Sequence, residues 1–95
     1  MDIDTSQILR SLGKAEAIAV LRVLRDGGYG FNEIKDEVKT DPKTLARRLD
    51  DFTELGIVEK KEDSNYHLTE SGDKILALAE KMESVLSSEV NEVAQ

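Results

Sequence analysis

FNEIKDEVKTDPKTLARRLDDFTELGIVEKKEDSNYHL, residues 31–68, is the stretch of this 95-residue chain that decides its fold. It opens with Phe31, Ile34 and Val38 at helical spacing, which predicts a helix over about 31–39. After a short break comes a second segment with helical periodicity. Two β-like runs around a polar turn complete the stretch. The predicted order is therefore helix, turn, helix and hairpin.

The second helix, expected at about 42–54, has the clearest boundaries in the chain. Asp41 is a good N-cap, because its carboxylate can accept hydrogen bonds from amides that have no helical partner. Pro42 suits the first helical position, where no N–H is needed, and Gly56 favours a stop. The apolar stripe at i, i+4, i+7 consists of Leu45, Leu49 and Phe52. The break before this helix is short enough to force a sharp angle, as a helix-turn-helix requires.

Two runs at 57–61 and 66–68 predict a hairpin, because both are short, hold apolar β-formers and flank a polar turn. The turn at 62–65 is brief, so we expect a compact wing at about 57–68. A helix-turn-helix followed by a hairpin is the order of a winged helix-turn-helix. The expected fold class is therefore mainly α with a small β-hairpin.

Helices are also expected on both sides of this stretch. Apolar spacing predicts helices at about 5–12, with Thr5 or Ser6 as N-cap, and at about 14–26, ended by two glycines. After the hairpin, Thr69 is the expected N-cap of a last helix over about 70–93. Some 24 residues of helix reach about 35 Å, which is long for a protein of this size.

The length of the last helix suggests that this small protein has two regions with different roles. Residues 1–74 are expected to form a winged helix-turn-helix DNA-binding domain, and residues 75–95 a helical extension. An apolar stripe that runs past a small core needs a partner, and a second subunit is the simplest one. The residues expected to make a homodimer contact are Met82, Val85, Leu86, Val90 and Val93.

The charge distribution points to nucleic acid at one place only. The net charge is −7, which argues against indiscriminate binding to nucleic acid, yet residues 39–48 hold four basic residues and one acidic residue. This basic cluster coincides with the front of the helix at 42–54, and a helix can enter the major groove with its first turns. The candidate DNA contacts on this helix are Lys43, Thr44, Arg47 and Arg48.

Two alternatives stay open for these charges. The helix could simply present a solvated face, with Arg47 paired to Asp51 at i, i+4. On the wing, Lys60, Lys61 and Asn65 are candidates for contact with duplex DNA, whereas the alternative is an exposed edge strand protected by charge.

Nothing in the sequence indicates catalysis, a metal or a cofactor. The chain has no cysteine, so disulfides, thiolate ligands and thiol nucleophiles are excluded, and one histidine cannot build a transition-metal site alone. The acidic pairs are adjacent in sequence rather than convergent, so we expect no catalytic residues. No apolar run approaches a membrane span, and the polar N-terminus does not read as a signal peptide, so a cytoplasmic location is expected.

The runs LRVLRDGGYGFNEIKDEV, DPKTLARRLDDFTELGIVEKK and YHLTESGDKI together resemble winged helix-turn-helix transcription regulators. The HxlR-like group is most similar, with MarR- and ArsR-type proteins and small archaeal regulators as relatives. The resemblance covers about residues 14–76. It implies that the DPKTLARRL helix reads double-stranded DNA, that the wing supports it, and that the protein is a homodimer. The lack of cysteine removes the thiol sensing that some relatives use.

Two functions therefore remain. The first is a DNA-binding transcriptional regulator that reads duplex DNA with the helix at about 42–54 and supports it with the wing at about 57–68. The second is a winged-helix module for protein–protein interaction, or an adaptor of the transcription machinery. The acidity of the chain favours this rival, and binding to duplex DNA would separate the two.

Overall fold

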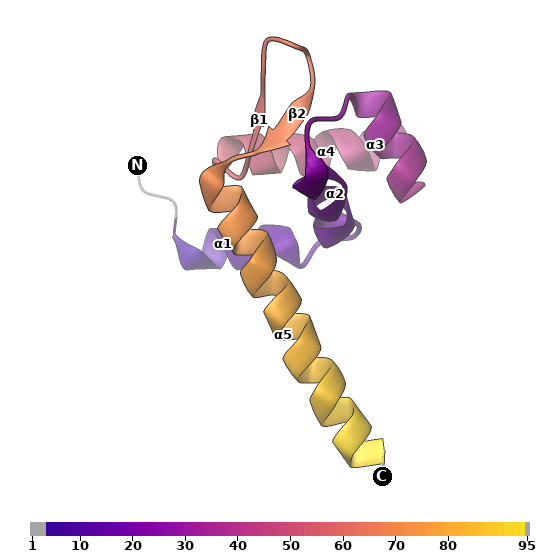
Figure 1. The fold of residues 1–95 in the computed structure, drawn as a ribbon, viewed down its shortest axis with the longest axis vertical. Coiled ribbons are helices and arrows are strands. Elements are labelled where there is room, and N and C mark those ends of the chain that lie inside the picture. Colours follow the sequence, from indigo (N-terminus) through magenta and orange to yellow (C-terminus); the bar gives the residue numbers. More distant parts are fainter. Residues whose placement is uncertain (1–3, 95) are drawn as a thin grey trace.

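The computed structural model describes the backbone of residues 4–94 and the side chains of residues 4–87. Helices dominate, and a two-stranded hairpin stands at one end while the last helix projects from the other (Figure 1). This confirms the predicted fold class. The elements in chain order are α1 (Thr5–Leu12), α2 (Ala17–Val23), a 3₁₀ turn η1 (Leu24–Asp26), α3 (Phe31–Val38), α4 (Pro42–Glu54), β1 (Val58–Lys60), β2 (Tyr66–Leu68) and α5 (Glu70–Ala94).

The first two helices lie where the sequence predicts them, but their starts differ. The N-cap of α1 is Asp4, neither Thr5 nor Ser6, because Asp4 and Gln7 form a reciprocal capping box with two bonds of 2.9 Å. The second helix begins three residues later than expected. Glu16 adopts a left-handed conformation, with φ 67°, in the tight turn that reverses the chain, so α2 cannot extend back across it.

The helix-turn-helix forms as predicted. Lys39 ends α3 in a left-handed conformation with φ 59°, and only two further residues separate it from α4. This sharp turn lets the buried Ile34 of α3 face the stripe of α4 in one core. The fully buried core also draws on α2, η1, the hairpin and α5; its members are Ala17, Val20, Leu21, Leu24, Ile34, Leu45, Leu49, Phe52, Ile57, Val58 and Leu76.

The wing is a short antiparallel hairpin in which Val58 pairs with Leu68 and Lys60 pairs with Tyr66. It is tied to the rest of the protein by an isolated bridge between Tyr29 and Tyr66, with reciprocal backbone hydrogen bonds of 3.1 and 2.8 Å. The bridge holds the hairpin against the segment that leads into α3. Because Tyr66 and Lys60 are the strand pair next to the turn, the bridge anchors the hairpin at that end, and only the turn at 61–65 extends beyond it.

Thr69 caps α5 as predicted, since its hydroxyl accepts a hydrogen bond of 2.9 Å from the Gly72 amide. The same hydroxyl donates to the Gly56 carbonyl at 2.6 Å. Further along α5, Leu76 and Ala79 are buried, so contact with the core extends beyond residue 74. All described side chains after Glu80 are exposed, and α5 continues away from the body of the protein (Figure 1).

Gly72 is required by a close approach between α5 and the start of β1. A Cβ added at Gly72 would lie 2.0 Å from the Ile57 carbonyl oxygen. We therefore expect Gly72→Ala to destabilise the protein by about 1–3 kcal/mol through overpacking, although alanine normally favours a helix. The exposed neighbour Ser71 provides the matched control, because Ser71→Ala meets no such contact. Equal stability of the two variants in urea unfolding at one protein concentration would contradict this close approach.

A second prediction concerns the cap of α4. Hydrogen bonds from the amide and hydroxyl of Thr44 hold the pKa of the Asp41 carboxyl below its ordinary value. A carboxyl whose folded pKa is lowered stabilises the fold above its unfolded pKa, about 3.9, and that stability is lost as the pH falls through the folded pKa. Asp41→Asn retains an uncharged cap, so stability should depend less on pH below about 4 than in the wild type.

The control for this experiment is Asp50→Asn, which removes an exposed carboxylate from the same helix. The Asp50 carboxylate makes no hydrogen bond or ion pair to any residue that the structure describes, so this variant should keep the wild-type dependence of stability on pH. Thermal unfolding followed by circular dichroism across an acidic pH series measures both. An Asp41→Asn profile that matches the wild type would reject the cap as an acid-sensitive contact.

Candidate nucleic-acid interface

The burial of one face of α4 decides which of its side chains reach solvent. Leu45, Leu49 and Phe52 are at most 1% exposed, as the sequence predicts. Lys43 and Arg47 therefore lie on the exposed side, within the first two turns of the helix. Such a helix offers positive charge at its front, where the amide dipoles also favour an anion.

Thr44 lies at the same end but is already engaged with the N-cap. Its amide donates to Asp41 Oδ1 at 2.8 Å and its hydroxyl donates to Asp41 Oδ2 at 3.0 Å. The hydroxyl proton is thus used within the helix, and only its oxygen lone pairs remain for an outside group. In this arrangement Thr44 orders the helix start and does not offer a proton to a phosphate.

Arg48 differs from its neighbour Arg47, although the sequence gives both the same chemistry. The Arg48 side chain is only 11% exposed, and its Nη1 donates to Asp51 Oδ2 at 3.3 Å. Its Nε is buried without a hydrogen-bond partner among the described residues. Asp51 also pairs with Lys14 at 3.4 Å, so the acid that the sequence pairs with Arg47 instead joins Arg48 to the turn before α2. Arg48 is held against the protein and Arg47 is not.

The two wing lysines are both exposed but lie differently. The Lys60 ammonium is 5.4 Å from the centroid of the Tyr66 ring, a cation–π distance that holds it along the hairpin. Lys61 follows at the end of β1, where its backbone forms the turn through hydrogen bonds with Ser64 and Asn65. Both ammonium groups are therefore available on the wing, close to its turn.

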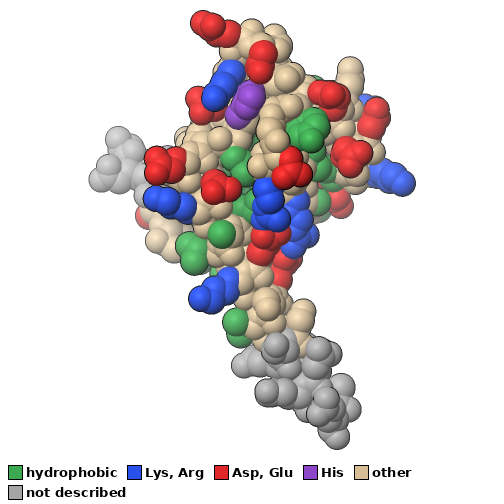
Figure 2. Space-filling view, in the orientation of Figure 1, with side chains coloured by type: hydrophobic (Ala, Val, Ile, Leu, Met, Phe, Trp, Pro, Cys, Tyr) green, Lys and Arg blue, Asp and Glu red, His purple; other side chains and the backbone are tan. Residues whose placement is uncertain are grey.

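Asn65 does not project from the tip of the wing. Its side-chain oxygen lies 3.4 Å from the place a Cβ on Gly30 would occupy, so it faces the start of α3. The tip itself carries the exposed acids Glu62 and Asp63, and acidic side chains gather at the end of the hairpin in Figure 2. A phosphate backbone would be repelled by this tip, whereas Lys60 and Lys61 lie below it.

The His67 side chain stabilises the same turn and packs on the loop before α3. Its Nε2 lies 3.1 Å from Asp63 Oδ2, and its ring covers Gly28 so closely that a Cβ there would be 2.1 Å from the ring. The Asn65 amide and then His67 lower the pKa of the Asp63 carboxyl. The histidine is thus part of the wing's own packing.

An apolar groove lies between α1 and α5, on the opposite end of the protein from the wing. Its volume is about 670 Å³. Met82, Val85 and Leu86, which the sequence assigns to a dimer contact, line it with more than half of each side chain exposed. Val90 and Val93 lie outside the residues whose side chains the structure describes.

The α1 half of this groove was not predicted. Ile8, Leu9 and Leu12 line it, and Leu9 is 49% exposed. The signal was present, since these apolar residues recur on one short helix whose other members are polar. What the sequence does not reveal is that α1 lies beside α5 rather than covering the core alone.

Neither a membrane span nor a cluster of metal ligands is present among the residues that the structure describes. Among residues 4–94 no helix is long and apolar enough to cross a bilayer. Among the side chains that the structure describes, those of residues 4–87, no three acidic or histidine groups converge as metal ligands would.

Comparison with protein families places most of the chain in one of them. The family model described as the HVO_A0261 N-terminal domain matches residues 5–90. A comparison with curated proteins found no match.

Solved structures of transcriptional regulators share both fold and sequence with this chain. The quinone-bound YodB of B. subtilis is 30% identical, with a TM-score of 0.79, over 87% of this chain and 94% of that one. A possible HxlR family transcriptional factor from Thermoplasma volcanium GSS1 is also 30% identical, with a TM-score of 0.69, over 93% and 89%. The repressor BigR from Xylella fastidiosa, 23% identical over 84% and 83% with a TM-score of 0.68, shares the fold. The chain thus belongs to the family of the HVO_A0261 N-terminal domain, among the winged helix-turn-helix transcriptional regulators of the HxlR type.

Proposed function

We propose that this protein is a homodimeric transcriptional regulator that reads duplex DNA with the front of α4 and steadies the contact with its wing. The proposal rests first on one observation. Lys43 and Arg47 are exposed on the front of a helix whose opposite face is buried, and this helix is the second of the helix-turn-helix. The relatives support a regulator rather than an enzyme, since those compared are transcriptional regulators.

The chemistry of the contact follows from the hydrogen-bond donors and charges that each side chain does not use within the protein. The Arg47 guanidinium can donate two parallel hydrogen bonds to O6 and N7 of guanine in the major groove. Lys43, Lys60 and Lys61 suit phosphates, because an ammonium is a compact charge without a planar fork. Thr44 and Arg48 are hydrogen-bonded to Asp41 and Asp51, and the Asn65 side chain faces Gly30, so we assign all three to positioning α4 and the wing.

A second copy of this chain is the proposed occupant of the groove between α1 and α5. Leu9, Leu78 and Leu86 are 49%, 63% and 59% exposed there, and an apolar face of this kind is costly in water. A two-fold axis lets one such face bury the other, since an isologous contact uses the same residues on both sides. Dimers of this design present two reading helices to two half-sites.

The rival function, a protein-interaction module, has a specific observation in its favour. The wing tip carries Glu62 and Asp63, and α3 exposes Glu33, Asp36 and Glu37. These surfaces repel a phosphate backbone and suit a basic protein partner. Sequence-selective binding to duplex DNA argues against the rival, and absence of binding at low salt favours it.

The test is selection of bound sequences from a random duplex pool, followed by titration of a selected and a scrambled duplex across a salt series. We expect strong preference for the selected duplex and a salt slope of about −0.9 for each phosphate that the protein contacts. Equal affinity for both duplexes would reject selective reading. No affinity for any duplex at low salt would support the rival.

Variants of Arg47 and Arg48 make this test more specific, because Arg47 is exposed whereas Arg48 is paired with Asp51. Arg47→Ala should weaken binding to the selected duplex by about 1–3 kcal/mol and relax specificity at one base pair. Arg47→Lys is the matched control, since it keeps the charge but loses the bidentate fork, so the salt slope should stay while discrimination falls. Arg48→Ala should instead lower thermal stability. A larger loss of specificity in Arg48→Ala than in Arg47→Ala would reverse the assignment.

A separate prediction concerns the dimer. Leu86→Asp and Leu9→Asp each place a charge in the groove, so each should shift the protein from dimer to monomer without loss of helix content. Ala77→Asp is the control, because Ala77 is exposed and nine residues before Leu86, on the opposite side of α5. Sedimentation velocity at tens of micromolar measures all three. A monomeric wild type, or a dimer that survives both groove variants, would refute this interface.

A further inference from the structure

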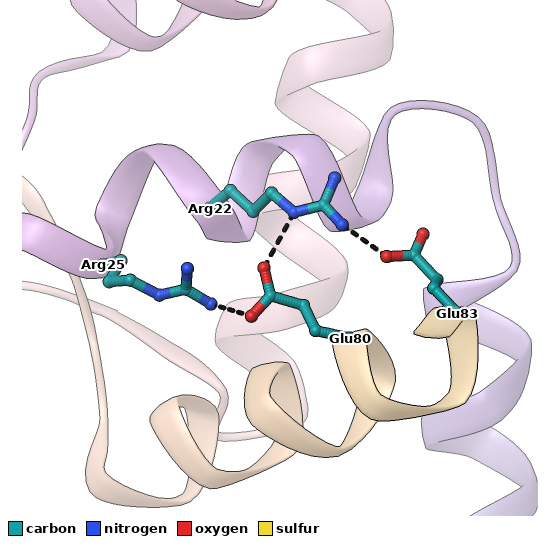
Figure 3. A network of polar contacts seen from close by, with 4 residues as sticks. All are labelled: Arg22, Arg25, Glu80 and Glu83. Carbon is teal, nitrogen blue, oxygen red and sulfur yellow. Dashed lines mark hydrogen bonds and ion pairs between the residues drawn. The ribbon is translucent and has the colours of Figure 1, made fainter. Parts of the chain in front are cut away.

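Four charged side chains join α5 to α2 and to the 3₁₀ turn η1 that follows it. Arg22 of α2 donates from Nε to Glu80 Oε2 at 2.9 Å and also pairs with Glu83. Arg25 of η1 pairs with the second oxygen of Glu80. In Figure 3 both arginines reach from α2 and η1 towards α5, and Glu80 lies between them. We call Arg22, Arg25, Glu80 and Glu83 the α2–α5 clasp.

The clasp lies where α5 leaves the body of the protein. The last buried side chain of α5 is Ala79, and the side chains described from Lys81 onwards are exposed. Glu83 and Glu80 thus make the last polar contacts that the structure describes between α5 and earlier elements. Met82 and Leu86 face the groove with α1, on a different side of the same helix. The clasp therefore holds α5 on the side that faces α2 and η1, whereas the groove lies on the side that faces α1.

The contacts of the clasp are suited to fixing the direction of α5, and they add little to the stability of the fold. The arginine side chains are 46% and 44% exposed, so solvent screens much of each attraction. Geometry compensates in part, because each oxygen of Glu80 accepts from a different arginine and Arg22 joins two acids that lie about one turn apart on α5. Both arginines lower the pKa of the Glu80 carboxyl, and the hydrogen bond to Glu80 raises the pKa of Arg22.

A small change in direction at the clasp becomes a large displacement along the helix. From Glu80 to Ala94, α5 extends about 21 Å at 1.5 Å per residue. A swing of about 10° at Glu80 would therefore move the far end by about 4 Å, close to the 3.4 Å rise of one base pair. In a dimer held through α5, the two reading helices would shift relative to each other by a comparable amount.

We propose that the α2–α5 clasp sets the angle between α5 and the DNA-reading head, and thereby the half-site spacing that the dimer accepts. The inference rests on the proposed function, because it assumes a dimer that reads two half-sites. It assigns Arg22, Arg25, Glu80 and Glu83 as positioning residues with no contact to DNA. Arg22 and Arg25 are exposed but paired with these acids, so we do not count them among the DNA contacts.

The experiment compares the wild type with Glu80→Gln/Glu83→Gln, which neutralises the clasp with little change in shape. A charge-swapped variant, Arg22→Glu/Arg25→Glu with Glu80→Arg/Glu83→Arg, restores attraction with reversed sign. Glu70→Gln is the matched control, because among the described side chains Glu70 pairs with Lys74 alone, in the same helix, at 3.6 Å. Circular dichroism checks that each variant is folded, and Arg25→Gln provides a milder variant that removes one contact.

Two measurements report on the angle. The chain has no cysteine, so Asp50→Cys places a single spin label on the exposed surface of α4, and the label-to-label distance across the dimer reports the separation of the reading heads. Titration against selected half-sites separated by successive single base pairs reports the spacing preference. We expect a narrow distance distribution and a preference of about tenfold for one spacing in the wild type.

In Glu80→Gln/Glu83→Gln the distances should broaden and the spacing preference should fall below about threefold, while the charge-swapped variant recovers both. Glu70→Gln should match the wild type. A neutralised clasp that keeps the wild-type distances and spacing preference would overturn the clasp proposal alone. A wild type that gives no distance between protomers, or selects no duplex, would overturn the proposed function and the clasp proposal with it.

Discussion

The arrangement of α4, the wing and α5 depends on one junction, where the backbones of Gly56, Ile57 and Gly72 meet around Thr69. The Thr69 amide donates to the Ile57 carbonyl at 3.0 Å, and its hydroxyl bonds to Gly56 and accepts from Gly72. Gly72 approaches Ile57 so closely that no side chain fits between them. The end of α4, both strands of the wing and the start of α5 are thereby held as one unit.

The sequence predicts best those elements for which local and tertiary signals agree. The bounds of α4 are as expected, because its cap, its first-turn proline and its apolar stripe all specify the same helix. The start of α2 was predicted wrongly, since it depends on a chain reversal at Glu16, where no glycine or proline marks the left-handed conformation. A turn fixed by packing between helices leaves little trace in the local sequence.

The candidate site was predictable in position but not in the state of each side chain. Arg47 and Arg48 are identical neighbours in the sequence, and only the fold distinguishes them. Arg48 is held by Asp51, which also meets Lys14 from 37 positions away. Asn65 likewise faces Gly30, a residue that the hairpin pattern does not connect with it. Contacts between elements distant in sequence decide which polar groups remain free.

These internal contacts also explain how an acidic protein can present positive charge at the front of one helix. Arg22, Arg25 and Arg48 are paired within the fold, so their charges do not extend the basic surface. The exposed Lys43 and Arg47 then stand out at the front of α4 against acidic surroundings. Repulsion from those surroundings is screened beyond about 8–10 Å, whereas direct hydrogen bonds act only on close docking. Under the proposed function, such a distribution disfavours non-specific attachment to any duplex, and affinity then depends on the few contacts that a matching sequence completes.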